Sequence, residues 1–203
     1  MTISNRTPVP DKTTFTNFLP AEVAAITGLN VETQRVWRRR EQLPGSGTPA
    51  RFSPLDVAEI FIRYQFSLHG LPPGQSQAIG RAYAPTLLHF ALINVDGACE
   101  VIGSKDDVDL YVHAFEDGEG PASQISSATN ATRYLWHAGE AVRETNDLGE
   151  ITAANGHVSA SFVDLVEAGV RLAEAARRPL VTVEFPTVGD DVRRIRRLTG
   201  GQT

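Results

Sequence analysis

A short basic cluster is the part of this sequence whose residue types and spacing most clearly indicate a chemistry. Four arginines, Arg35, Arg38, Arg39 and Arg40, occur within six residues, although the whole chain carries a formal net charge of −5. Residues 1–80 hold eight basic and six acidic side chains, a net charge of +2, which leaves −7 for the remainder. Guanidinium groups bind phosphates and guanine edges, so such a cluster favours a nucleic-acid interface. Because the acidic remainder repels phosphate, we expect binding to be confined to the N-terminal part.

The residues around the cluster predict a helix that separates the arginines. Asn30 is a good N-cap, and Glu32 suits the positive end of the helix dipole. We expect Trp37 to anchor the helix in the core and Arg40 to lie towards the packed seam. On a helix with 100° per residue, the side chains of residues 31–42 divide between two sides. One side holds Thr33, Val36, Trp37 and Arg40, and the opposite side holds Arg35, Arg38, Arg39 and Gln42.

Another short helix is predicted just before this one. Pro20 is a favourable first helical residue, and "AEVAAIT" supplies an apolar side. Gly28 is placed to end the helix in the left-handed conformation, so residues 27–30 form a tight turn, as in a helix-turn-helix. Residues 43–52 contain two prolines and two glycines and predict a loop or short hairpin. The following "SPLD", residues 53–56, predicts a capped helix start.

Residues 17–80 resemble the N-terminal DNA-binding domain of the MerR family of transcription regulators. The segment "GLNVETQR" is similar to that family's turn and recognition-helix start, and "RFSPLDVAEI" to the arginine-aromatic pair and capped helix after its wing. The segment "LHGLPPGQSQAI" is similar to the break before its fourth helix. The resemblance implies a winged helix-turn-helix in which residues 31–42 enter the major groove of DNA and residues 44–51 form the wing.

The resemblance also implies roles for single residues. Thr33, Arg35 and Trp37 occupy positions that touch or buttress the DNA backbone, Arg38 and Arg39 occupy polar recognition positions, and Arg51 closes the wing. The residues themselves leave the roles of Gln34 and Gln42 open, and both are kept as candidates. The predicted DNA-binding residues are therefore Thr33, Gln34, Arg35, Arg38, Arg39, Gln42 and Arg51, with Asn30 and Trp37 as structural anchors of the recognition helix.

The chain departs from the MerR pattern in several places. Gln34 stands where the family has an apolar residue, and Glu41 stands where a glycine closes the recognition helix. The wing is short and Arg51 is its one base, so we expect weaker DNA binding with a smaller salt dependence. Pro85 interrupts the helix that would lead into the family's coiled coil, and no heptads follow. With a single cysteine, Cys99, the metal-sensing branch is not expected.

Beyond residue 95 the pattern predicts a small α+β domain. "ACEVIG", "PLVTVEF" and "RYLWHA" predict strands, and "KDDVDLYVHAF" predicts a helix. Asn155-Gly156 between alternating runs predicts a hairpin, and residues 161–178 predict one helix with Ser161 and Asp164 as a capping box. The predicted fold class is thus α+β. Its parts are a flexible segment 1–16, a winged helix-turn-helix 17–80, a connecting helix 81–95, a dimerisation or sensor domain 96–187 and a basic flexible tail 188–203.

No other group of residues predicts a catalytic or metal site. The histidines lack metal-ligand spacing, and Cys99 is predicted to be a buried, inert thiol. Residues 106–109 favour a helix N-terminus, and "GSK" at 103–105 lacks the first glycine of a phosphate loop. No apolar run reaches the roughly 18 residues of a membrane helix, and the polar N-terminus does not resemble a secretory signal. We therefore expect a cytoplasmic protein that is not an enzyme and uses no cofactor.

The function predicted from these features is sequence-specific regulation of transcription. Two copies of the chain are expected to bind double-stranded DNA as a homodimer, with a small-molecule or protein effector on the C-terminal domain. Two alternatives remain open. One is a phage or mobile-element DNA-binding protein such as a terminase small subunit or an excisionase, and the other is a helix-turn-helix adaptor that binds protein instead of DNA.

Overall fold

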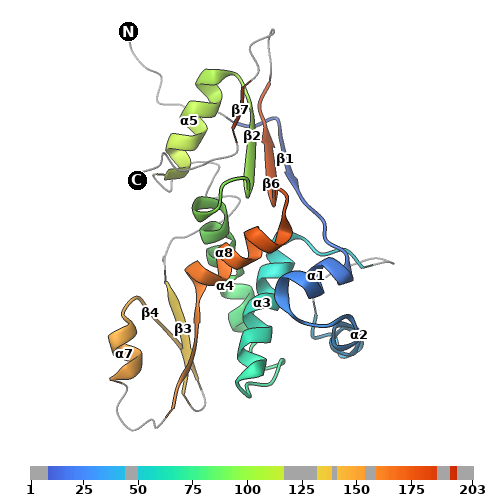
Figure 1. The fold of residues 1–203 in the computed structure, drawn as a ribbon, viewed down its shortest axis with the longest axis vertical. Coiled ribbons are helices and arrows are strands. Elements are labelled where there is room, and N and C mark those ends of the chain that lie inside the picture. The colour runs from blue at the N-terminus through green and yellow to red at the C-terminus, as the bar shows by residue number, and fades with distance from the viewer. Residues whose placement is uncertain are drawn as a thin grey trace.

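The computed structural model has a mixed α+β fold, as the sequence predicts. It describes residues 9–43, 50–116, 132–138, 141–153, 159–186 and 193–195. The helices in these ranges are α1 (Pro20–Thr27), α2 (Val31–Arg39), α3 (Pro54–Leu68), α4 (Gln77–Asn94), α5 (Lys105–Glu116), α7 (Leu148–Thr152) and α8 (Leu165–Ala176). The strands are β1 (Lys12–Phe15), β2 (Cys99–Gly103), β3 (Tyr134–His137), β4 (Val142–Thr145), β5 (Ser161–Asp164), β6 (Val181–Glu184) and β7 (Arg193–Ile195), as Figure 1 shows.

One sheet has the strand order β1-β6-β2-β7. The two central strands, β6 and β2, are parallel, and Val101 lies opposite Val183 with both side chains buried. The edge strands β1 and β7 each pair antiparallel with a central strand. Helix α5 packs against β2 and β7 beside this sheet (Figure 1). The predictions of two short buried strands and of a helix over 105–115 are confirmed, and the helix extends one residue further.

Both edge strands come from segments predicted to be flexible. β1 lies within residues 1–16 and pairs with β6, and β7 lies within residues 188–203 and pairs with β2. The prediction of flexible ends is therefore wrong for these two strands. Both strands are short, with four and three residues, and strand preference depends strongly on context, so pairing with a distant strand decides their conformation.

The other sheet is antiparallel, with the order β4-β3-β5. β3 confirms the strand predicted at "RYLWHA". The run before Asn155-Gly156 forms helix α7 instead of a strand, and β5, which follows that pair, lies beside β3. The predicted hairpin is therefore wrong. Residues 154–158 themselves lie outside the described residues. Asp147 starts α7, because its Oδ1 accepts a hydrogen bond from the Gly149 N–H at 2.7 Å.

Helix α8 begins four residues later than predicted. Residues 161–164 form β5, and Val163 is buried against the core. Asp164, not Ser161, is the N-cap, since its Oδ1 accepts hydrogen bonds from the N–H groups of Val166 and Glu167 at 3.0 and 3.3 Å. The predicted capping box is therefore wrong, because the N-cap lies three residues later than predicted, although Asp164 retains a capping role.

Two further helices position the N-terminal part. α3 begins with the predicted capping box, in which Ser53 Oγ accepts from the Asp56 N–H at 3.2 Å and Asp56 Oδ2 accepts from the Ser53 N–H at 2.8 Å. α4 continues through Pro85, where we expected a break. Proline removes one N–H from the helix, and packing of α4 against both α3 and α8 offsets that loss. None of the helices in the described ranges combines the length and hydropathy that a membrane span requires.

One buried apolar cluster joins the two predicted domains. It extends from Val23 of α1 to Val183 of β6. Arg178, just after α8, also connects them, because its Nη2 donates to the Asn17 carbonyl at 3.2 Å and to the Glu22 carboxylate at 2.8 Å. The predicted DNA-binding part and the C-terminal part therefore share a hydrophobic core.

Candidate nucleic-acid interface

Helix α2 starts at the N-cap that the sequence predicts. Asn30 has an extended backbone with φ −61° and ψ 154°, and its Oδ1 accepts from the Thr33 N–H at 2.8 Å. Glu32 lies in the first turn, where a carboxylate favours the positive end of the helix. Gly28 ends α1 with φ 83°, so only residues 28–30 separate the two helices. Figure 1 shows α2 nearly end-on at the periphery of the molecule, beside α1.

The C-terminal end of α2 has a Schellman geometry with a glutamate at its left-handed position. Glu41 has φ 55°, a conformation that side chains other than glycine rarely adopt. Its N–H donates to the Arg38 carbonyl at 2.9 Å, and the Gln42 N–H donates to the Trp37 carbonyl at 2.9 Å. This is the position at which the resemblance places a glycine. The helix therefore ends in the expected geometry, although the residue differs.

Two side chains attach the inner side of α2 to the core. Trp37 is buried, as predicted for the anchor. Gln34 is 1% exposed, and its Nε2 donates to the carbonyls of Pro20 at 2.9 Å and Leu29 at 2.8 Å. The candidate role of Gln34 in binding DNA is thus corrected, because its amide is buried and bonded to α1 and to the turn. An amide at this position donates to the partly buried Pro20 carbonyl and to the buried Leu29 carbonyl, which an apolar residue could not do.

The outer side of α2 presents three of the predicted arginines. Arg35 pairs with Glu32 at 3.1 Å, and both side chains are about two-thirds exposed. Arg38 and Arg39 are exposed, and within the described ranges neither forms an ion pair. Together these four residues line an open hollow on the surface. The structure therefore gathers Arg35, Arg38 and Arg39 on one accessible face, as the helical spacing predicts.

Arg40 differs from its predicted position. It is the C-cap residue, with φ −95°, and its side chain is exposed instead of lying in the seam between helices. The helix ends at Arg39, three residues earlier than the projection over residues 31–42 assumed, and the change in backbone direction turns Arg40 outward.

The remaining predicted contact residues are Thr33, Gln42 and Arg51. Thr33 is half-buried, and its N–H is used by the N-cap. Gln42 is also half-buried and faces the turn between α3 and α4. Its Nε2 lies close to Gly74 in that turn, 3.4 Å from the position that a Cβ on this glycine would occupy. Arg51 is exposed beside the β-bridge between Phe18 and Phe52. Residues 44–49, most of the predicted wing, lie outside the described residues.

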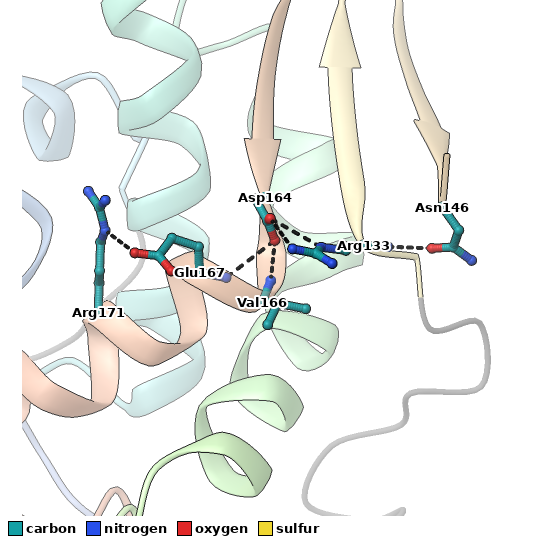
Figure 2. A network of polar contacts seen from close by, with 6 residues as sticks. All are labelled: Arg133, Asn146, Asp164, Val166, Glu167 and Arg171. Carbon is teal, nitrogen blue, oxygen red and sulfur yellow. Dashed lines mark hydrogen bonds and ion pairs between the residues drawn. The ribbon is translucent and has the colours of Figure 1, made fainter. Parts of the chain in front are cut away.

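In a network at the ends of β3 and β5 both arginines are paired, unlike Arg38 and Arg39 of α2 (Figure 2). Arg133 donates from Nε and Nη2 to Asp164 Oδ2 at 3.1 and 2.9 Å, and its backbone N–H donates to Asn146 Oδ1 at 2.7 Å. Glu167 and Arg171 form a further pair at 3.0 Å. These groups cap α8 and join the strand ends, so their arrangement is explained by the fold.

The described residues show no second reactive centre. No group of three or more His, Cys, Asp or Glu side chains among them could hold a metal ion. Burial, with a smaller contribution from the Glu100 carboxylate, raises the pKa of the Cys99 thiol to about 12. Such a thiol remains protonated near neutral pH and is a poor nucleophile. The Asp107 carboxylate is a cap partner, accepting from Ser104 Oγ at 2.6 Å.

No known protein family matches this chain, and no curated protein shows significant similarity to it. One residue beneath the α2 face was not predicted from the sequence. Arg63 of α3 is completely buried under Trp37, and the sequence signal for it was its spacing of four from Glu59 within the apolar run of that helix.

Proposed function

We propose that this protein binds double-stranded DNA through α2, as a winged helix-turn-helix regulator similar to the MerR type. The observation that carries the proposal is the exposed face of Arg35, Arg38 and Arg39 on a helix whose opposite side is fixed in the core. Arg38 and Arg39 have no ion-pair partner among the described residues, so their guanidinium groups are available to phosphates or guanine edges.

Rigidity on the inner side of α2 supports the same function. Base readout requires donors to be held in one orientation relative to the groove, and a helix fixed by a buried amide and a buried indole meets that requirement. Arg51 adds an exposed cation at the end of the segment proposed as the wing. We further propose that two copies act together on two half-sites, as helix-turn-helix dimers generally do.

The proposal is tested by selecting duplexes from a random DNA pool with the full chain and measuring affinity by fluorescence anisotropy. The variant Arg38→Ala plus Arg39→Ala is expected to lower affinity for the selected site at least tenfold, because each good arginine-base contact contributes a factor of roughly 5 to 150. If these side chains contact phosphates, the slope of log K against log salt falls by about 0.9 for each lost contact.

The matched control is Arg143→Ala plus Arg171→Ala, which removes the same charge from β4 and α8. It is expected to change affinity about twofold or less, since general attraction is screened over about 10 Å at 0.1 M salt. Thermal unfolding of both variants shows that each is folded. Equal affinities of the folded α2 variant and the wild type refute the assignment, and failure of the wild type to bind DNA at low salt favours the protein adaptor.

A further inference from the structure

Arg63 of α3 is a buried cation that contacts α2, α4 and the turn between α3 and α4. Its side chain is 0% exposed, and its Nη1 donates to Glu59 Oε1 at 2.7 Å. Its Nη2 donates to the Pro73 carbonyl, in the turn between α3 and α4, at 3.2 Å. Its guanidinium carbon lies 5.6 Å from the centre of the Trp37 ring. The stem of the side chain lies against α4 at Gly80, where an added Cβ would be 2.7 Å from Arg63 Cγ.

Stability alone is a weak reason for this arrangement. Removing a guanidinium and a carboxylate from water is costly, and apolar replacements of similar volume often leave stability unchanged or improved. Arg63 Nε has no hydrogen-bond partner among the described residues, which adds to the cost. Burial lowers the pKa of Arg63, with the neighbouring Glu59 opposing that shift, yet an arginine stays charged near neutral pH.

The geometry assigns to Arg63 the role of a positioning residue for α2, and this inference rests on the proposed function of that helix. α2 has nine residues and two buried attachments. Gln34 fixes the first half to α1, and Trp37 fixes the second half, where Arg38 and Arg39 lie. The guanidinium against the indole therefore sets the angle at which the arginine face is presented.

An arginine suits this task better than an apolar side chain. Its planar fork is held in one orientation by Glu59 on one nitrogen and by the Pro73 carbonyl on another. A cation near an aromatic ring prefers the face of that ring, so the indole is favoured in one position. A flexible methionine of similar size fills the space but lets the ring slide along it.

The test compares Glu59→Leu plus Arg63→Met with the wild type in the full chain. The denaturant midpoint is expected to stay equal or rise, because both buried charges are removed together. Amide hydrogen exchange in α2 is expected to accelerate about tenfold or more, while exchange in α3 and α4 changes less than about threefold. Affinity for the selected DNA site is expected to fall about tenfold, with affinity for random DNA within about twofold.

Arg81→Ala is the control, since it removes the exposed partner that lies 3.5 Å from Glu59 and leaves the contact with Trp37. It is expected to leave α2 exchange and DNA preference unchanged. If the double variant does not fold, Arg63→Lys keeps a cation beside Glu59 but loses the planar fork, and it is expected to loosen α2 in the same way.

Unchanged α2 exchange in the folded variant overturns the inference. Equal acceleration in α2, α3 and α4 also overturns it, since that pattern shows a contribution to general stability alone. Hydrogen exchange is measured without DNA, so a wild type that fails to bind DNA refutes the proposed function while the positioning role of Arg63 is still decided by α2.

Discussion

Replacing Glu41 with glycine is expected to stabilise the protein. Glu41 has φ 55°, and a residue with a Cβ pays about 1–2 kcal/mol to adopt the left-handed conformation. Glycine adopts it freely but loses more chain entropy on folding, by roughly 0.5–1 kcal/mol. The central values of about 1.5 and about 0.75 kcal/mol predict a net gain of roughly 0.5–1 kcal/mol for Glu41→Gly. Both backbone hydrogen bonds at this helix end, from the N–H groups of residues 41 and 42, are retained in the variant.

The gain is measured as a shift in thermal and urea midpoints. For a chain of 203 residues, 1 kcal/mol corresponds to about 2–4 °C, so the expected increase is about 1–4 °C. Glu41→Ala is the matched control because it removes the same carboxylate and keeps the Cβ; it is expected to change stability by less than about 0.5 kcal/mol. If Glu41→Gly is no more stable than Glu41→Ala, the reasoning from backbone conformation is wrong.

The same pair of variants separates charge from backbone in DNA binding. Glu41 is exposed and follows the last arginines of the α2 face. Both variants remove one negative charge, so both are expected to raise DNA affinity by similar factors at low salt, and less at high salt. A gain seen with glycine alone would instead assign the effect to the geometry of the helix end.

Three further outcomes follow from buried contacts. Gly169→Ala is expected to destabilise the protein by about 1–3 kcal/mol in urea titrations, because the new Cβ would lie 2.7 Å from the Ala91 backbone nitrogen. Gln34→Ala is expected to lower the urea-derived free energy of unfolding by about 1–3 kcal/mol, since the buried Leu29 carbonyl and the partly buried Pro20 carbonyl each lose a donor. Burial raises the pKa of the Cys99 thiol from 9.0 to about 12. Above pH 9 the thiol ionises more readily in the unfolded chain than in the folded one. The contribution of Cys99 to the free energy of unfolding is therefore complete below pH 9 and is lost as the pH rises towards 12. The urea midpoint of the wild type should therefore fall more steeply above pH 9 than that of Cys99→Ala, and parallel pH profiles would contradict the assignment.

Local signals in the sequence predicted local structure well. Gly28, Asn30 and the pair Ser53 and Asp56 lie at helix ends as expected, because capping depends on residues within three or four positions of each other. The spacing of the arginines also predicted their shared exposed face, since a helix fixes which residues lie together.

Long-range partners account for what the sequence did not predict. Gln34 and Arg63 were recognisable as polar residues, but their burial depends on carbonyls and an indole supplied by other elements. The ends of the described chain likewise form strands only because β6 and β2 lie beside them. Such contacts have no counterpart in neighbouring residues, so a pattern read along the chain cannot show them.

The pairing of β1 with β6 has a consequence for how the protein forms. Lys12 lies opposite Glu184, 172 positions later. β1 therefore cannot pair with β6 until most of the chain has been synthesised. At synthesis rates of roughly 5–20 residues per second, α1 to α3 are complete on the order of ten seconds before β6 is made. During that interval the apolar surfaces that later pack against α8 are uncovered. Contacts this distant also slow folding, so we expect the basic helix to form early and the sheet that joins both ends to close last.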